Sequence, residues 1–294
     1  MEYRVLYETG KEKLEASAIA EAALDARLLL EYVCGTDRNT LLVHPEREVS
    51  VQEEETYRAL LEKRAVHIPL QHLTGVQDFM GLEFAVNEHV LIPRQDTEIL
   101  MEEVTREPFD GAEILDLCTG SGCILLSLLH YSNHCHGVGV DISPEALQVA
   151  ECNAGRLEIS DEQVEFLEGD LYEALEPGRK FDLLVSNPPY IQSGVIPTLM
   201  PEVREHEPLL ALDGMEDGLF FYRKIIKQAP EWLRAGAGIY FEIGFDQALA
   251  VEQLLREAGF TEIRTVQDYA GLDRVVCARL YNLHYYRRKE RQNV

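Results

Sequence analysis

The sequence has little positive charge for its size. Lysine and arginine total 27 residues against 52 aspartates and glutamates, so the net charge is −25. Most of such a surface would repel a duplex phosphate backbone. We therefore expect no direct binding of nucleic acid.

The sequence also has no closely spaced cysteine pair and no long apolar run. Without a Cys-x-x-Cys pair, the six cysteines do not suggest a zinc knuckle or a disulfide framework. No segment approaches the roughly 20 uninterrupted apolar residues of a bilayer span. The first residues, Met1 to Arg4, lack the pattern of a signal peptide. These absences predict a cytoplasmic protein with reduced thiols and no membrane partner.

What the sequence does contain is enough apolar material for a sizeable core. Of its 294 residues, 46% are hydrophobic and 27% are charged, which excludes wholesale disorder and fibrous classes. The length fits one large domain and one small domain.

The first 75 residues have the pattern of helices. Apolar residues recur at helical spacing from Ala16 to Val33, and Gly35 stops the run. Ser50 and Glu53 read as a capping box that opens a second helix. Short strand-like runs follow, at residues 79–80 and 82–86, separated by Gly81. We expect a helical domain over residues 1–75 and a β-hairpin connector over residues 76–108.

Residues 109–294 alternate between strand and helix patterns, which predicts an α/β domain with a parallel sheet. Ser143 and Pro144 form a helix start, and Asp246 is expected to cap a helix that ends at Gly259. The turn between the last two strands is too short for a helical crossover, so these strands should pair antiparallel. The expected strands are residues 113–117, 136–140, 164–167, 181–185, 239–243, 262–266 and 274–280.

A glycine-rich loop follows the first of these strands, in the sequence Asp116-Leu117-Cys118-Thr119-Gly120-Ser121-Gly122. Glycines there let the backbone approach a ligand beyond the carboxyl ends of the strands. The third glycine of a dinucleotide fingerprint is replaced by Leu125, which weakens the case for nicotinamide binding. Asp141 ends the next strand, where a carboxylate can accept ribose hydroxyl protons, and Asp170 follows the third strand.

A second polar loop, Asn187-Pro188-Pro189-Tyr190, follows the fourth strand. The two prolines stiffen it and hold Asn187 extended. The Asn187 side-chain oxygen and the Pro188 carbonyl are then two acceptors suited to a planar NH2 group. Tyr190 offers a flat face on which a planar amide or base can stack.

The order of these two loops and the two acidic residues resembles the class I methyltransferases that use S-adenosylmethionine. Those enzymes have a Rossmann-like sheet of seven strands, the last of them antiparallel. Within them the chain most resembles the HemK/PrmC family, which methylates the N5 amide nitrogen of glutamine in the Gly-Gly-Gln loop of peptide chain release factors. Further matching segments are residues 67–75, 93–98, 208–219, 242–244 and 268–276.

Two departures from the family pattern concern the loops on the substrate side. Gln95 stands where the family usually has proline, and only Gly214 remains of a glycine pair within residues 213–215. Neither touches the proposed chemistry. Thr97 and Glu98 separate the chain from the related ribosomal-protein glutamine methyltransferases.

The resemblance implies a role for each candidate residue. The cofactor would be S-adenosylmethionine, which becomes S-adenosylhomocysteine when its methyl group is transferred. The loop that starts at Asn187 would bind the substrate and take part in methyl transfer. The helical residues 1–75 would contact the protein substrate, and residues 109–294 would form the methyltransferase domain. Cofactor binding is expected of Asp116, Thr119, Gly120, Gly122, Asp141, Asp170 and Asn187; catalysis of Asn187, Pro188 and Tyr190; and substrate binding of Asn187, Pro188, Pro189 and Tyr190.

Two other functions remain open at this stage. An adenine-N6 methyltransferase could use the same loop on a flipped-out base, although the net charge opposes it. A protein that binds S-adenosylmethionine without turnover is the second alternative, against which the intact loop at Asn187 argues.

We expect no metal site at His130, His134, Cys135 and His136, since no distant donor cluster matches them. The basic residues 281–294 are read as a solvated terminus.

Overall fold

A computed structural model describes residues 1–281, and the basic tail lies almost wholly outside the described residues. The chain forms two compact units. One unit comprises Met1–Val76 and Met200–His206, and the other comprises Gln77–Leu199 and Glu207–Val294. In the described part of the chain, no helix is long and apolar enough to cross a membrane.

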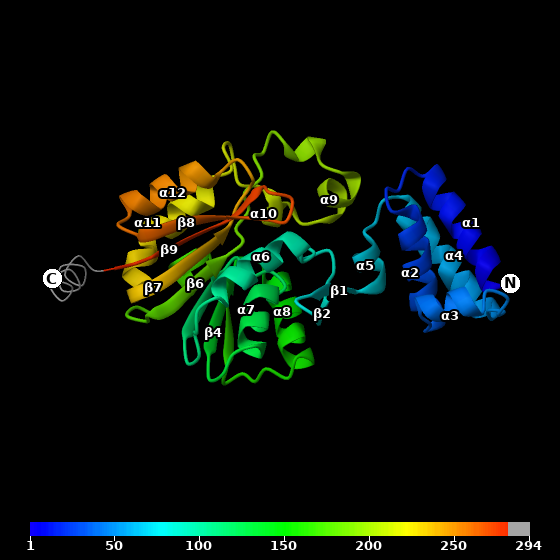
Figure 1. Cartoon of the computed structure of the whole chain (residues 1–294), viewed down its shortest axis with the longest axis horizontal. Helices are drawn as coiled ribbons and strands as arrows, with labels where there is room; N and C mark the ends of the chain where they lie inside the picture. The colour runs from blue at the N-terminus through cyan, green and yellow to red at the C-terminus, as the bar shows by residue number, and fades with distance from the viewer. Residues whose placement is uncertain (282–294) are drawn as a thin grey trace. The chain divides into compact units, whose positions relative to one another are not determined.

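The first unit is helical (Figure 1). Leu6, Leu29 and Tyr57 meet in its core, where the Tyr57 hydroxyl donates to the Ala26 carbonyl at 3.0 Å. A Cβ on Gly10 would lie 2.1 Å from that hydroxyl, so glycine permits the close contact between the first and fourth helices. The helices are α1 (Tyr3–Ala16), α2 (Ala22–Cys34), α3 (Arg38–Val43), α4 (Val51–Ala65), α5 (Leu70–Thr74) and α9 (Pro201–His206).

The capping box at Ser50 is confirmed, because Ser50 and Glu53 each bond to the other's backbone N–H. The helix expected from Ala16 begins instead at Ala22. Ala18 has a left-handed φ of 58°, and the Ile19 N–H bonds back to the Leu14 carbonyl, which ends α1. Ile19 is still buried in the same core, so the apolar spacing continues through a turn.

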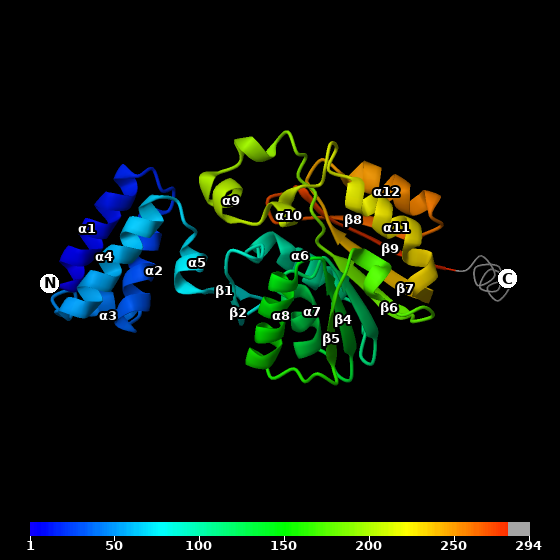
Figure 2. The same cartoon turned by 180° about the vertical axis from the view of Figure 1, so that it is seen from behind.

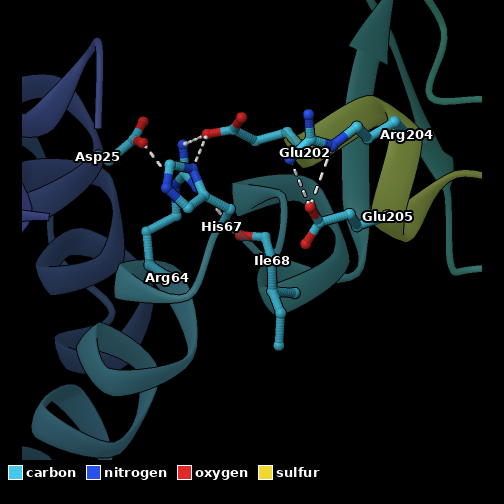
Figure 3. Close-up of polar contacts among 7 residues, drawn as sticks. All are labelled: Asp25, Arg64, His67, Ile68, Glu202, Arg204 and Glu205. Atoms are coloured by element: carbon cyan, nitrogen blue, oxygen red, sulfur yellow. Dashed lines mark hydrogen bonds and ion pairs between the residues drawn. The ribbon is translucent and has the colours of Figure 1, made fainter. Parts of the chain in front are cut away.

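A buried ion-pair network holds α9 within the helical unit (Figure 3). Arg64 of α4 donates to Asp25 of α2 at 2.7 Å and to Glu202 of α9 at 3.0 Å. The His67 ring lies 2.9 Å from the same Glu202 oxygen. Burial opposes ionisation of Glu202, but its hydrogen bonds with His67 and Arg64 outweigh burial and lower its pKa. The structure thus places a short segment from the second half of the sequence in the helical unit.

The second unit contains a seven-stranded sheet in the order β5-β4-β3-β6-β7-β9-β8. Strand β9 is antiparallel to both of its neighbours, while the pairs from β5 to β7 are parallel. The predicted α/β sheet of seven strands with an antiparallel last strand is confirmed. Its strands are β3 (Glu113–Leu117), β4 (His136–Asp141), β5 (Val164–Glu168), β6 (Phe181–Ser186), β7 (Leu233–Glu242), β8 (Thr261–Gln267) and β9 (Asp273–Arg279).

Helices cover both faces of this sheet (Figures 1 and 2). One apolar core packs α11 (Phe220–Trp232) and α12 (Ala248–Glu257) on one face. The other packs α6 (Gln95–Val104), α7 (Cys123–His130) and α8 (Pro144–Arg156) on the opposite face. Short helical turns complete the unit: η1 (Leu171–Ala174), η2 (Ile196–Thr198) and α10 (Leu209–Leu212).

A two-stranded hairpin, β1 (Val76–Phe79) and β2 (Leu82–Ala85), precedes α6 as expected. Met80 and Gly81 both have positive φ, as the tight turns that match strand twist require. Two other expectations were wrong. Strand β7 begins at Leu233, six residues before the predicted Ile239, because a bulged stretch with Gly236 and Gly238 obscures its pattern. Asp246 does not cap α12, which follows Gln247 without a side-chain cap bond.

Candidate active site

The glycine-rich loop connects β3 to α7 and has an unusual backbone. Cys118, Gly120 and Gly122 all have positive φ. A Cβ on Gly122 would lie 3.0 Å from the Leu126 side chain and 3.2 Å from that of Ala150, so this glycine lets α7 and α8 pack closely. Among the described residues, no atom lies within 4 Å of a Cβ placed on Gly120, which leaves its backbone open to a ligand.

Two aspartates hold this loop in place by accepting hydrogen bonds from it. Asp141, at the end of β4, accepts the Gly120 N–H at 2.9 Å and the Ser143 N–H at 3.0 Å. With about four lone-pair sites in all, this carboxylate can also accept a ligand hydroxyl. Asp116 is fully buried and accepts the Thr119 hydroxyl at 2.7 Å. Burial raises the pKa of Asp116 to about 7, and the nearby charge of Asp141 adds to the rise.

A cavity of about 330 Å³ opens at the carboxyl ends of the strands, a size suited to a small cofactor. Of the residues expected from the sequence, its walls include Thr119, Gly120, Asp141, Asp170, Asn187 and Pro189. The side chains of Asp116 and Tyr190 support loops from behind, and Gly122 and Pro188 are likewise not among the lining residues. The structure therefore brings both predicted loops and both predicted acids to one place.

The wall of the cavity formed by α11 was not predicted from the sequence. Lys224 of α11 donates to Asp170 at 2.6 Å and lies 5.5 Å from the centre of the Phe220 ring. Phe220 and Phe221 line the cavity beside them. These residues belong to an ordinary amphipathic helix, and only the fold turns this end of α11 toward Asp170.

Asn187 begins the second loop directly after β6, and a buried chain of polar contacts starts at its side chain. Its Nδ2 lies 3.4 Å from the Thr97 Oγ1, which in turn lies 2.5 Å from the Glu242 Oε2. The Tyr190 hydroxyl donates to the other Glu242 oxygen at 3.1 Å. Burial and the adjoining Glu242 carboxyl raise the pKa of Tyr190, so its hydroxyl remains protonated.

Gln247 fixes the backbone of the same loop. Its Nε2 donates to the Tyr190 carbonyl at 2.9 Å and to the Gly218 carbonyl at 3.2 Å, while its Oε1 accepts the Gly244 N–H at 2.9 Å. A glutamine just before α12 resembles a plain helix start, so its sequence gives no sign of this role.

The segment after α10 packs directly on the loop. A Cβ on Gly214 would lie 2.7 Å from the Tyr190 Cα, so the loop leaves no room for a side chain at this position. Met215 occupies a left-handed φ of 71° that glycine adopts at less cost, and it lines the cavity. The departure from the family pattern thus places a thioether at the rim of the site.

Arg94 forms a further wall. It is half-exposed, lines the cavity and donates to both oxygens of Glu207 at 2.5 and 2.6 Å. Burial raises the pKa of Glu207, although the charge of Arg94 acts in the opposite direction. Within residues 1–281, no group of three or more histidine, cysteine or acidic residues is placed to hold a metal ion.

The sheet order, the glycine-rich loop and the cavity at the strand ends define a class I methyltransferase. A methyltransferase small domain family model matches residues 94–202. The fold is shared with the 16S rRNA N2 G1207 methyltransferase of T. thermophilus, solved in complex with AdoMet and guanosine. That structure has a TM-score of 0.50 and 19% identity, and covers 70% of this chain and 49% of its own.

The family is narrower than the class. The PrmC N-terminal domain model matches residues 6–75. The release factor glutamine methyltransferase of Geobacter sulfurreducens is 42% identical over 91% of this chain and 93% of its own. That of Caulobacter vibrioides is 44% identical over 91% of this chain and 92% of its own. The chain belongs to the release factor glutamine methyltransferase family.

Proposed function

We propose that this enzyme transfers a methyl group from S-adenosylmethionine to the side-chain amide nitrogen of the glutamine in the Gly-Gly-Gln motif of peptide chain release factors. The observation that supports this most strongly is the position of Asn187. It lines the same cavity as the glycine-rich loop and Asp141, so an acceptor amide beside it would lie next to a cofactor held by those residues.

The residues around the cavity fit S-adenosylmethionine, which supplies the methyl group. Asp141 would accept the ribose hydroxyls through its free lone pairs, and Gly120 would let the ligand approach the backbone. The paired Asp170 and Lys224, with the Phe220 ring beside them, would bound the adenine. Asp116, through Thr119, would hold the loop in shape rather than reach the ligand.

Asn187 and Pro188 would bind the acceptor amide. An amide nitrogen is a poor nucleophile because its lone pair is delocalised into the carbonyl. The Asn187 Oδ1 and the Pro188 carbonyl would each accept one N–H and direct the nitrogen toward the methyl group. As positive charge develops on that nitrogen, both acceptors bind it more strongly, which favours the transition state. We assign no base, because the proton becomes acidic once the nitrogen is alkylated and can leave to water.

The other two residues of the loop would shape it. Pro189 lines the cavity and would pack against the flat acceptor amide. Tyr190 donates its hydroxyl proton to Glu242, and this hydrogen bond would fix the position of the loop. We also propose that the helical unit binds the protein substrate and that the acidic surface attracts a basic release factor in the cytoplasm.

Methyl transfer from labelled S-adenosylmethionine into purified release factor, DNA and RNA, compared side by side, tests this function. We expect label in the release factor only, and in one glutamine of it. Label in adenine would support the N6-methyltransferase instead. Cofactor binding without transfer to any of the three would support a binding protein.

A further inference from the structure

The contact chain behind Asn187 joins three separate segments of the sequence, and its two inner members are buried. Thr97 comes from α6, Glu242 from the end of β7, and Asn187 from the loop after β6. Thr97 and Glu242 are each only 2% exposed. Because buried polar groups are costly unless they are paired, the pattern of donors and acceptors in this chain is tightly constrained.

Counting protons fixes the direction of the Asn187 amide. A threonine hydroxyl has one proton, and a carboxylate can only accept. The Thr97 proton is therefore donated to Glu242 across 2.5 Å, and the Thr97 oxygen is left to accept. The group of Asn187 that faces Thr97 must be its NH2, at 3.4 Å, so its Oδ1 is turned the other way.

Several groups around Glu242 favour its carboxylate form. The Tyr190 hydroxyl donates to its second oxygen, and Arg274 lies close enough for its charge to favour the anion. Arg274 is itself held by Asp96 and Asp268, at 3.1 Å each. Burial and the charge of Asp96 oppose ionisation and raise the pKa of Glu242, whereas Thr97, Tyr190 and Arg274 counteract this rise.

We propose that Glu242, acting through Thr97, sets the direction of the Asn187 amide and thereby makes the site select an NH2 group over a carboxylate. This inference rests on the proposed function. Glu242 and Thr97 are positioning residues in this scheme, because they act on the acceptor through Asn187. With Oδ1 facing the acceptor, glutamine is bound by two hydrogen bonds, whereas glutamate meets two acceptors and is rejected.

Glu242→Gln should reverse the direction of the hydrogen bonds that link residue 242, Thr97 and Asn187. The new amide can keep accepting from Tyr190 and donate its NH2 to the Thr97 oxygen. The Thr97 proton is then free for the Asn187 Oδ1, which turns the Asn187 NH2 toward the acceptor. We expect single-turnover methylation to fall at least about tenfold, and the preference for glutamine over glutamate in binding to fall about tenfold.

Thr97→Val removes the hydroxyl at nearly constant shape, so both directions of the amide become accessible. We expect a loss of preference of about tenfold, and recovery of turnover to within about threefold of wild type in Thr97→Ser. Glu103→Gln is the matched control for loss of a buried carboxylate. Glu103 is 1% exposed and pairs with Arg106 and Arg264 at 2.8 and 2.6 Å, away from Asn187. This control should keep the wild-type preference.

The measurement is the ratio of two affinities, for a release factor with its Gly-Gly-Gln glutamine and for the same protein with glutamate there. Calorimetry in the presence of S-adenosylhomocysteine gives both affinities. The rate of methyl transfer to the glutamine form is then measured in a single-turnover assay. A ratio that falls in Glu242→Gln and Thr97→Val, but not in Glu103→Gln, supports the inference. An unchanged ratio overturns it, even if turnover falls. If Glu242→Gln does not fold, the valine and serine variants at position 97 decide. If wild-type enzyme does not methylate the release factor, the proposed function itself fails.

Discussion

Gly218 lies directly against the carbonyl of Tyr190, where a Cβ on the glycine would be 2.3 Å from the carbonyl oxygen. Gly218 also has a φ of +71°, and the same Cβ would be 2.5 Å from the Gln247 Nε2 that holds this carbonyl. The conformation of the loop at Asn187 therefore depends on a glycine that lies 28 residues after Tyr190 in the sequence.

Gly218→Ala should displace the Tyr190 carbonyl and break its bond to Gln247. We expect a loss of about 1–3 kcal/mol in the free energy of unfolding, and a larger fall in turnover than in cofactor affinity. Gly178→Ala is the control, because Gly178 has a φ of +91° but no atom of residues 1–281 lies within 4 Å of a Cβ added there. Urea unfolding and single-turnover assays measure both effects. Equal activity in the two variants would show that the contact with Tyr190 is unimportant.

Asp141→Ala should weaken S-adenosylhomocysteine binding about tenfold or more, because a charge-assisted hydrogen bond contributes roughly 1.5–3 kcal/mol. Calorimetry on the folded variant measures the affinity. Glu145→Ala is a nearby control, since Glu145 lies in the first turn of α8 and does not line the cavity. Unchanged affinity in Asp141→Ala would remove this residue from the cofactor site.

Asp116 should make stability fall as the pH rises. Its folded pKa of about 7 lies above the ordinary value of 3.8 that we assume for the unfolded chain. Its stabilising contribution is complete below about pH 4 and is lost as the pH rises through 7, at up to about 1.4 kcal/mol per unit. Asp116→Asn removes this dependence, so its unfolding free energy should decline less steeply from pH 5 to 7. Parallel curves for the two proteins would contradict the raised pKa.

Arg64→Met should destabilise the helical unit, because it leaves the carboxylates of Asp25 and Glu202 without their shared partner. Removing one member of a buried ion pair typically costs about 3–5 kcal/mol. Arg27→Met is the control, since Arg27 pairs with Glu31 one turn along α2 and its loss should cost less than about 1 kcal/mol. Thermal unfolding measures both.

The same Arg64→Met variant tests the proposed role of the helical unit. If that unit binds the release factor, methylation of intact release factor should fall while S-adenosylhomocysteine affinity stays unchanged. Full methylation by a variant with a melted helical unit would exclude this role.

The sequence predicted the parts of the site that depend on local pattern. Strands, strand-end acids and stiff loops leave short signals, and the sheet brings the carboxyl ends of its parallel strands together. The structure accordingly places both loops, Asp141 and Asp170 around one cavity, while their roles stay predictions. The prediction that Asp246 caps α12 was wrong. The residue just before α12 is Gln247, and its side chain donates to the Tyr190 carbonyl.

The supporting contacts leave no local signal because they join distant segments. Thr97 and Glu242 are 145 residues apart, and each stood out only within a stretch that resembles the family. Lys224 and Asp170 are 54 residues apart and meet only because α11 packs on the sheet. Their roles follow from the fold and could not be read from spacing.

Single-turnover methylation by Asn187→Ala, measured beside a cofactor titration, tests the central claim most directly. The resemblance assigns Asn187 to both cofactor and substrate binding, but in the proposed mechanism Asn187 faces the acceptor amide and the ribose contact belongs to Asp141. We expect turnover to fall about 100-fold or more, because one preorganised contact to the transition state is lost, while S-adenosylmethionine affinity barely changes. Near-normal turnover, or a loss explained wholly by weaker cofactor binding, would contradict the proposed mechanism.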